Sequence, residues 1–179
     1  MNRQPILQGG AVHLRPLQAD DWDALYAVAR DPLLWEQHPV HDRWREDVFR
    51  TFFEDALAAG GALVAVHRPS GAIAGSSQFR PCPLDPREIE IGWTFLARTH
   101  WGTGMNREIK RLMIGHALAR FPRVLFRIGE GNLRSRKAIE RVGGRLVEGW
   151  VEDGAYQGRP VRHVVYEITR DDFTGGALA

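Results

Sequence analysis

A glycine-rich turn stands where a strand pattern gives way to a helix pattern. The stretch Trp101 to Glu108 reads WGTGMNRE and contains Gly102 and Gly104. Glycine lets the backbone turn sharply and approach a ligand closely, and the unpaired N–H groups at a helix start attract an anion. The spacing indicates a phosphate-binding turn or an ordinary tight turn. It does not match a dinucleotide fingerprint, because Arg107 stands in place of the third glycine.

A second helix start follows the next predicted strand. The segment from Asn132 to Gly144 carries Arg134, Ser135 and Arg136 in its first turn. Asn is a common helix cap, and capping is one interpretation of Asn132. The other interpretation is that two positive helix ends, each after one of two neighbouring parallel strands, meet at one crevice and bind a long, polyphosphorylated ligand. The sequence leaves both open.

The charge distribution also bears on the ligand. The formal net charge of the 179 residues is only +2. Residues 97–150, however, contain twelve Lys or Arg against four Glu, which leaves −6 for the remainder. A concentrated basic segment in a nearly neutral chain indicates either a bound anion or solvated helix faces. No basic and aromatic recognition pattern accompanies this charge, so we expect no nucleic-acid partner.

Cysteine usage and apolar runs indicate the compartment. Cys82 is the only cysteine, which excludes a disulfide framework and fits a reducing compartment. The opening MNRQPILQGG lacks the apolar run of a secretory signal, and no later stretch approaches the ~20 apolar residues that span a bilayer. No spacing of histidines and carboxylates indicates a metal site. We expect a cytoplasmic protein without membrane or metal, as a monomer or a homodimer.

The elements that position these residues follow from apolar periodicity. We expect a mixed α/β fold in a single domain over residues 1–179, with its core from about 11 to 168. The predicted strands cover 11–15, 62–68, 73–80, 87–95, 124–129, 145–152 and 161–169, and the predicted helices cover 20–30, 46–59, 104–120 and 133–142. Residues 153–158 are expected to connect the last two strands.

Together the glycine turn and the second helix start resemble the GNAT N-acetyltransferases. Gly102-Thr103-Gly104 is similar to the pyrophosphate-binding turn of that family, and Asn132 with Ser135 is similar to the helix that follows. The opening strand VHLRPL and the strand end Ile91-Gly92-Trp93 resemble the ribosomal-protein (RimJ/RimL-like) branch. The resemblance covers nearly the whole chain. It implies a central, mostly antiparallel, splayed sheet flanked by helices.

The resemblance also implies an acetyl-CoA site between the strands 87–95 and 124–129. Acetyl-CoA would be the cosubstrate, with pantetheine on exposed strand backbone and pyrophosphate on the glycine turn. The residues implied to bind it are Phe95, Leu96, Ala97, Gly102, Thr103, Gly104, Met105, Asn106, Arg107, Asn132 and Ser135. The acceptor would be an amine, either a small molecule or a protein N-terminus.

Two departures from the family pattern bear on the chemistry. Thr99 stands where relatives usually have Gln or Arg, three residues before the first glycine. Ile139 stands where many relatives have the tyrosine that protonates the leaving thiolate, which excludes tyrosine acid catalysis from that position. A serine is the proposed thiol partner in the ribosomal-protein branch. Ser135 is therefore the candidate acid, with capping of the first helical turn as its other interpretation.

A general base is needed because an ammonium cannot attack a thioester. Lysine-like amines have a pKa of ~10 and α-amines of ~8, so a base, or a water chain leading to one, must act near neutral pH. Glu90 is the candidate, since it lies on the strand that leads to the thioester; a solvated strand carboxylate is the alternative. His100, His38 and His41 are weaker candidates.

The acceptor would be held by the connection between the first two helices and by the last hairpin. These segments supply Trp35, His38, Trp44 and Tyr156, which suit an aromatic-lined pocket. The sequence thus predicts an N-acetyltransferase that works by direct attack in a ternary complex, without a covalent enzyme intermediate. A catalytically silent module that binds acyl-CoA as a sensor or interaction domain is the alternative, because the family tyrosine is missing.

Overall fold

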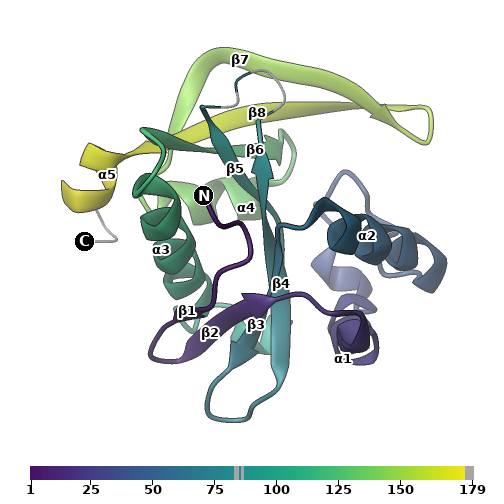
Figure 1. The fold of residues 1–179 in the computed structure, drawn as a ribbon. Helices are drawn as coiled ribbons and strands as arrows, with labels where there is room; N and C mark the ends of the chain where they lie inside the picture. The colour runs from purple at the N-terminus through teal and green to yellow at the C-terminus, as the bar shows by residue number, and fades with distance from the viewer. Residues whose placement is uncertain (83–84, 86, 176–179) are drawn as a thin grey trace.

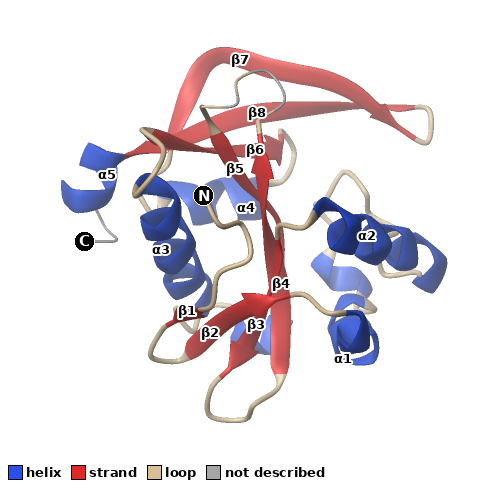
Figure 2. Ribbon diagram, viewed as in Figure 1, coloured by secondary structure: helices blue, strands red, loops and turns tan. Residues whose placement is uncertain are grey.

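The computed structural model describes residues 1–82, 85 and 87–175. Its centre is an eight-stranded sheet with the order β1-β2-β3-β4-β5-β6-β8-β7. Neighbouring strands are antiparallel except β5 and β6, which run parallel. Helices α1 and α2 cover one side of the sheet, and α3, α4 and α5 lie on the other (Figure 1). This mixed, mostly antiparallel sheet flanked by helices is the predicted architecture (Figure 2).

The elements have the following bounds. The strands are β1 (Leu7–Gln8), β2 (Val12–Pro16), β3 (Ala62–His67), β4 (Ile73–Pro81), β5 (Ile89–Leu96), β6 (Arg123–Gly129), β7 (Arg145–Tyr156) and β8 (Arg159–Thr169). The helices are α1 (Trp22–Ala29), α2 (Glu46–Ala59), α3 (Met105–Leu118), α4 (Leu133–Glu140) and α5 (Arg170–Gly175). Short 3₁₀ turns cover Ala19–Asp21, Pro32–Leu34 and Arg98–His100.

The connection predicted over residues 153–158 is wrong. Strand β7 continues to Tyr156 and β8 begins at Arg159, so only two residues form the turn. These two, Gln157 and Gly158, have φ angles of 49° and 74°. Two positive φ angles are typical of the hairpin turn whose twist matches its strands. The hairpin is therefore longer than predicted, and its tip extends to the α2 side of the sheet (Figure 1).

Two apolar layers hold the helices against the sheet. One layer joins the sheet to α3 and α4 and includes Ile91, Met113 and Phe126, which are at most 3% exposed. The other joins the sheet to α1 and α2 and includes Phe49 and Phe95. Because side chains alternate between the two faces of a strand, β5 contributes to both layers, through Ile91 on one side and Phe95 on the other, whereas Phe126 of β6 lies in the α3 and α4 layer.

The parallel strands β5 and β6 pair only at their beginnings. The paired residues are Ile89 with Val124 and Glu90 with Leu125. Beyond this point β5 follows β4 through a bulge at Trp93, whose φ is 53°, while β6 stays paired with β8 up to Gly129. A bulge bends its strand and leaves ladder groups unpaired. The two strands therefore separate, as the resemblance implied, and leave a gap in the sheet.

Candidate active site

Two adjoining cavities occupy the gap between β5 and β6. The larger has a volume of about 640 Å³ and the smaller of about 160 Å³. Six residues line both: His38, Thr94, Asn106, Asn132, Ser135 and Ala138. The cavities are therefore two parts of one channel that passes through the splayed sheet.

The glycine turn forms one end of the larger cavity. Gly102 and Gly104 have φ angles of 76° and 89°, a backbone region that favours glycine. A Cβ at either position would meet no heavy atom within 4 Å, so both glycines border open space. Gly104 is also the residue before the first turn of α3, and Asn106 and Arg107 from that turn line the cavity. This is the geometry of an anion site at a helix start.

Most of the predicted cofactor-binding residues meet at this cavity. Those that line it are Phe95, Leu96, Gly102, Gly104, Asn106, Arg107, Asn132 and Ser135. Ala97, Thr103 and Met105 do not: the Ala97 N–H donates to Ala74 O at 2.8 Å, the Thr103 hydroxyl donates to His100 O at 2.8 Å, and Met105 lies in the core.

Asn132 and Ser135 have separate roles at the start of α4. The Asn132 side chain accepts a hydrogen bond from the Ser135 N–H at 3.2 Å, which confirms Asn132 as the helix cap. The Ser135 hydroxyl is therefore not needed for capping. It has no hydrogen-bond partner within the described part of the chain, and Ser135 lines both cavities. A hydroxyl at this junction is able to bond to a ligand that passes from one cavity to the other.

Glu90 is buried beside the smaller cavity and is not a solvated carboxylate. Its exposed fraction is 6%, and its Oε2 accepts a hydrogen bond from Arg127 Nη1 at 2.8 Å. Glu90 does not line the cavity itself, but its Oε1 lies 3.3 Å from the position of a Cβ at Gly92, which does. Burial raises the pKa of Glu90, and Arg127 acts against that rise.

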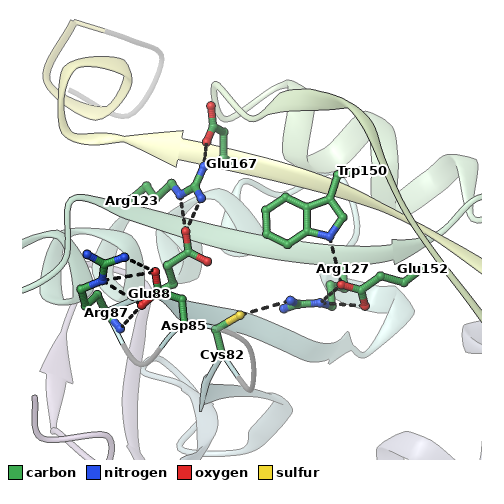
Figure 3. Close-up of polar contacts among 9 residues, drawn as sticks. All are labelled: Cys82, Asp85, Arg87, Glu88, Arg123, Arg127, Trp150, Glu152 and Glu167. Carbon is green, nitrogen blue, oxygen red and sulfur yellow. Dashed lines mark hydrogen bonds and ion pairs between the residues drawn. The ribbon is translucent and has the colours of Figure 1, made fainter.

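Besides Glu90, Arg127 has a second set of partners, and Figure 3 shows this second set. Its Nε donates to Glu152 at 2.9 Å and its Nη2 donates to the Cys82 sulfur at 3.2 Å. The Trp150 indole N–H also donates to Glu152, at 3.2 Å. Each of the three guanidinium nitrogens thus donates to an acceptor, which fixes the position of the Glu90 carboxylate.

The histidines named from the sequence differ in their access to the channel. His38 lines both cavities, but burial, followed by the charge of Arg43, lowers the pKa of its imidazole to about 3. His38 is therefore neutral and a weak base at neutral pH. His100 lines the larger cavity, and burial lowers its pKa. His41 is exposed and lines neither cavity.

The residues predicted to hold the acceptor are only partly at the channel. Trp35 lines the larger cavity and His38 lines both, whereas Trp44 and Tyr156 line neither. Trp44 is 41% exposed. The Tyr156 hydroxyl instead donates to Asp42 Oδ1 at 2.9 Å. This bond ties the tip of the β7–β8 hairpin to the segment between α1 and α2.

Sequence reasoning missed a buried lysine. Lys110 of α3 lines the smaller cavity and is only 7% exposed. Its Nζ donates to Thr94 Oγ1 at 2.7 Å, and burial lowers the pKa of the ammonium to about 7. Helical spacing from Asn106 through Lys110 to Met113 could have indicated that this lysine shares the buried face of α3.

The channel is lined by neutral and cationic side chains. No Asp or Glu among the described residues lines either cavity. Arg107, Arg134 and Arg141 line the larger cavity, and Lys110 and Arg127 line the smaller one. Within the described part of the chain, no group of three or more His, Cys, Asp or Glu is arranged to hold a metal ion. None of its helices is both long and apolar enough to cross a membrane.

A protein-family model for the acetyltransferase (GNAT) domain matches residues 11–145 of the chain. No curated protein gives a significant sequence match. Three similar solved structures show the same fold. A GCN5-related N-acetyltransferase from Brucella melitensis is 20% identical, with a TM-score of 0.80 over 98% of this chain and 82% of its own. A GNAT acetyltransferase from Bacillus anthracis is 14% identical, with a TM-score of 0.74 over 92% of this chain and 98% of its own. Mycobacterium smegmatis RimJ in complex with CoA-disulfide is 18% identical, with a TM-score of 0.73 over 97% of this chain and 90% of its own.

Proposed function

Because the chain belongs to the GNAT acetyltransferase family, we propose that it transfers the acetyl group of acetyl-CoA to an amine by direct attack within a ternary complex. The observation that carries this proposal is the two-part channel through the splayed sheet. Its larger part begins at the glycine turn and meets the smaller part at Ser135. A long anionic thioester fits a channel of this shape and charge.

The proposed acetyl-CoA site uses the cations and the helix start of the larger cavity. The N–H groups at the start of α3 and the guanidinium of Arg107 would bind phosphate oxygens. The edge of β5 that follows the bulge at Trp93 and does not pair with β6 would bind pantetheine. The thioester would then lie where the two cavities join, between Thr94 and Ser135.

In the proposed chemistry, a neutral amine attacks the thioester carbon and forms the amide C–N bond while the C–S bond breaks. Glu90 takes the proton from the amine, directly or through water, and the Ser135 hydroxyl donates a proton to the leaving sulfur. Proton exchange with water then returns Glu90 to the carboxylate and Ser135 to the hydroxyl. A base is most effective when its pKa approaches the working pH. Burial moves the pKa of Glu90 in that direction, and the charge and hydrogen bond of Arg127 act against that rise.

The acceptor is proposed to approach from the α1 and α2 side of the sheet. His38 and Trp35 reach the channel from that side, and the bond from Tyr156 to Asp42 places the hairpin tip beside it. The acceptor class is a primary amine, on a small molecule or at a protein N-terminus. Residues 1–179 would form one catalytic domain, working in the cytoplasm, where the buried thiol of Cys82 stays reduced.

Two measurements test the proposal. Acetyl-CoA at millimolar concentration should raise the melting temperature, because a ligand that binds the native state stabilises it. A flat response would overturn the proposal. Release of free CoA thiol should then be followed across α-amino peptides, lysine peptides, amino acids, polyamines and aminoglycosides. Binding without turnover on any amine would instead support the silent acyl-CoA-binding module.

A further inference from the structure

Lys110 is a buried ammonium in the smaller cavity. Its Nζ donates to Thr94 Oγ1 at 2.7 Å and lies 5.6 Å from the ring centroid of Phe126. No carboxylate among the described residues forms an ion pair with it. A buried charge without a counter-ion is unfavourable unless a ligand supplies one. The site is therefore complementary to an anion.

The second cation of the smaller cavity is already neutralised. Arg127 pairs with Glu90 at 2.8 Å and with Glu152 at 2.9 Å. Among the described lining residues, Lys110 is thus the cation whose charge remains available to a ligand. Asn106, one turn earlier on α3, lines both cavities and offers an amide beside it.

We propose that Lys110 binds the terminal carboxylate of an acyl chain, so that the smaller cavity accepts ω-carboxyacyl groups such as succinyl in addition to acetyl. This inference rests on the proposed use of acyl-CoA in the same channel. The transfer step is unchanged: the thioester C–S bond breaks, the amide C–N bond forms, and the distal carboxylate takes no part.

The size of the smaller cavity agrees with a longer acyl group. Its volume is about 160 Å³. A protein cavity of about 150 Å³ holds benzene, which corresponds to roughly six heavy atoms. An acetyl group fills only about half of that space. A succinyl chain, which is longer than acetyl by one methylene and one carboxylate, would extend from the thioester toward Lys110 and fill the remainder.

The position of Lys110 favours the acyl chain over the acceptor as the source of the carboxylate. Lys110 belongs to α3, which packs on the opposite face of the sheet from α1 and α2. Its neighbour Phe126 lies in the α3 layer, whereas Trp35 lies in the α1 and α2 layer. An acceptor that enters from the α1 and α2 side therefore meets the thioester before it reaches Lys110.

The test is a binding comparison with purified full-length protein near pH 6.5. Calorimetry would measure the affinities of free CoA, acetyl-CoA, butyryl-CoA and succinyl-CoA. Butyryl-CoA has the same carbon count as succinyl-CoA without the charge. We expect wild-type protein to bind succinyl-CoA at least about tenfold more tightly than butyryl-CoA, the usual effect of one charge-assisted hydrogen bond. Lys110→Met should remove the difference.

Matched variants separate this role from general effects. Lys137→Met removes the same charge from an exposed position on α4 that lines neither cavity, and it should keep the succinyl preference. Thr94→Val, which removes the hydroxyl bonded to Lys110, should reduce the preference and serves as a second variant.

Three other results would count against the inference. Equal wild-type affinities for succinyl-CoA and butyryl-CoA would overturn it, as would a preference that survives Lys110→Met. If the wild-type protein shows no preference among acyl groups and Lys110→Met raises the KM for acidic acceptors, the carboxylate that Lys110 binds belongs to the acceptor. This result also overturns the inference. If neither free CoA nor any thioester binds, the proposed function itself fails, and this outcome is distinct from binding of CoA without acyl preference.

Discussion

Arg127 and Glu90 form an ion pair at the point where β5 and β6 separate. Arg127 Nη1 lies 2.8 Å from Glu90 Oε2, and Glu90 belongs to the last residue pair that joins the two strands. The side chains are 13% and 8% exposed, so both charges are largely removed from water. A change to either residue should therefore affect the titration of a buried carboxylate as well as the packing at the end of the gap.

Glu90→Gln should lose catalysis while it keeps acetyl-CoA binding. Removal of a general base typically lowers the rate by ~10²- to 10⁴-fold, and the acidic limb of the pH–rate profile should disappear or move. The measurement is kcat and kcat/KM from pH 5 to 9 with calorimetry for acetyl-CoA. Glu88→Gln is the matched control, because Glu88 is also buried and pairs with an arginine of β6, Arg123 (Figure 3). A near-wild-type rate with an unchanged acidic limb in Glu90→Gln would remove Glu90 from the chemistry.

Arg127→Met should move the acidic limb to higher pH. The charge of Arg127 lowers the pKa of Glu90, so its loss raises that pKa and the carboxylate becomes a base only at higher pH. A nearby opposite charge typically shifts a carboxyl pKa by about 1–3 units, which gives the expected scale. The variant should also lose roughly 3–5 kcal/mol of stability, because it leaves the buried carboxylate of Glu90 without its partner. Arg127→Lys keeps the charge, so the acidic limb of the pH–rate profile should stay near its original pH. If the acidic limb also stays in place in Arg127→Met, then Arg127 does not set the pKa of the catalytic base.

Ser135→Ala should lower kcat without a loss of stability. Its hydroxyl caps no helix, since Asn132 caps α4, but it lies where the two cavities meet. Loss of a proton donor to the leaving sulfur should slow the reaction by ~10²-fold or more. Asn132→Ala provides the contrast, because removal of a helix cap costs about 1 kcal/mol. Thermal melts and single-turnover rates would separate the two, and a wild-type rate for Ser135→Ala would exclude the acid role.

Gly104→Ala should weaken CoA binding, and the strain of alanine at this positive φ should not account for the whole loss of affinity. Gly104 has a φ of 89°, so any side chain costs about 1 kcal/mol or more of stability, and its Cβ would enter the open space of the larger cavity. Gly71→Ala is a matched control: its φ is 70°, its Cβ also meets nothing within 4 Å, and it lies in the β3–β4 turn outside both cavities. Both variants should lose similar stability, whereas only Gly104→Ala should lose CoA affinity. Equal CoA affinities would place the phosphate site elsewhere.

The sequence was sufficient for elements that local patterns determine. Helix α2 has the predicted bounds, because Phe49, Phe52 and Phe53 recur on one face and Gly60 ends the helix in the left-handed region. The two-residue strand β1 was not predicted, since Leu7–Gln8 is too short to show alternation. The tight hairpin turn was missed because it places Gln157, a residue other than glycine, at positive φ.

The site could be predicted only where its signal is local. The glycine turn and Ser135 follow from short motifs, and the structure brings them to one channel. The pairing of Glu90 with Arg127 depends on the parallel register of two strands that are far apart in the sequence. The burial of Lys110 was not predicted, because a lysine in a helix is usually solvated; the side chain lines the smaller cavity between the strands.

Lys110→Met should stabilise the protein, and the gain should shrink as the pH rises. The pKa of Lys110 is about 7 in the fold, against ~10.4 for an unfolded lysine, so between these values the unfolded chain binds a proton that the native protein does not. Lys110 therefore lowers the free energy of unfolding most below about pH 7, and this destabilisation diminishes as the pH rises toward ~10.4.

Methionine has similar length and no charge. We expect Lys110→Met to raise the free energy of unfolding by about 1–4 kcal/mol at pH 7, and each kcal/mol corresponds to roughly 2–4 °C in Tm. The gain should diminish toward pH 10. Urea denaturation from pH 6 to 10 would measure it, with Lys137→Met, an exposed lysine, expected to show no such dependence. A destabilised Lys110→Met, or a gain that does not change with pH, would mean that the ammonium is compensated within the fold and does not await an anionic ligand.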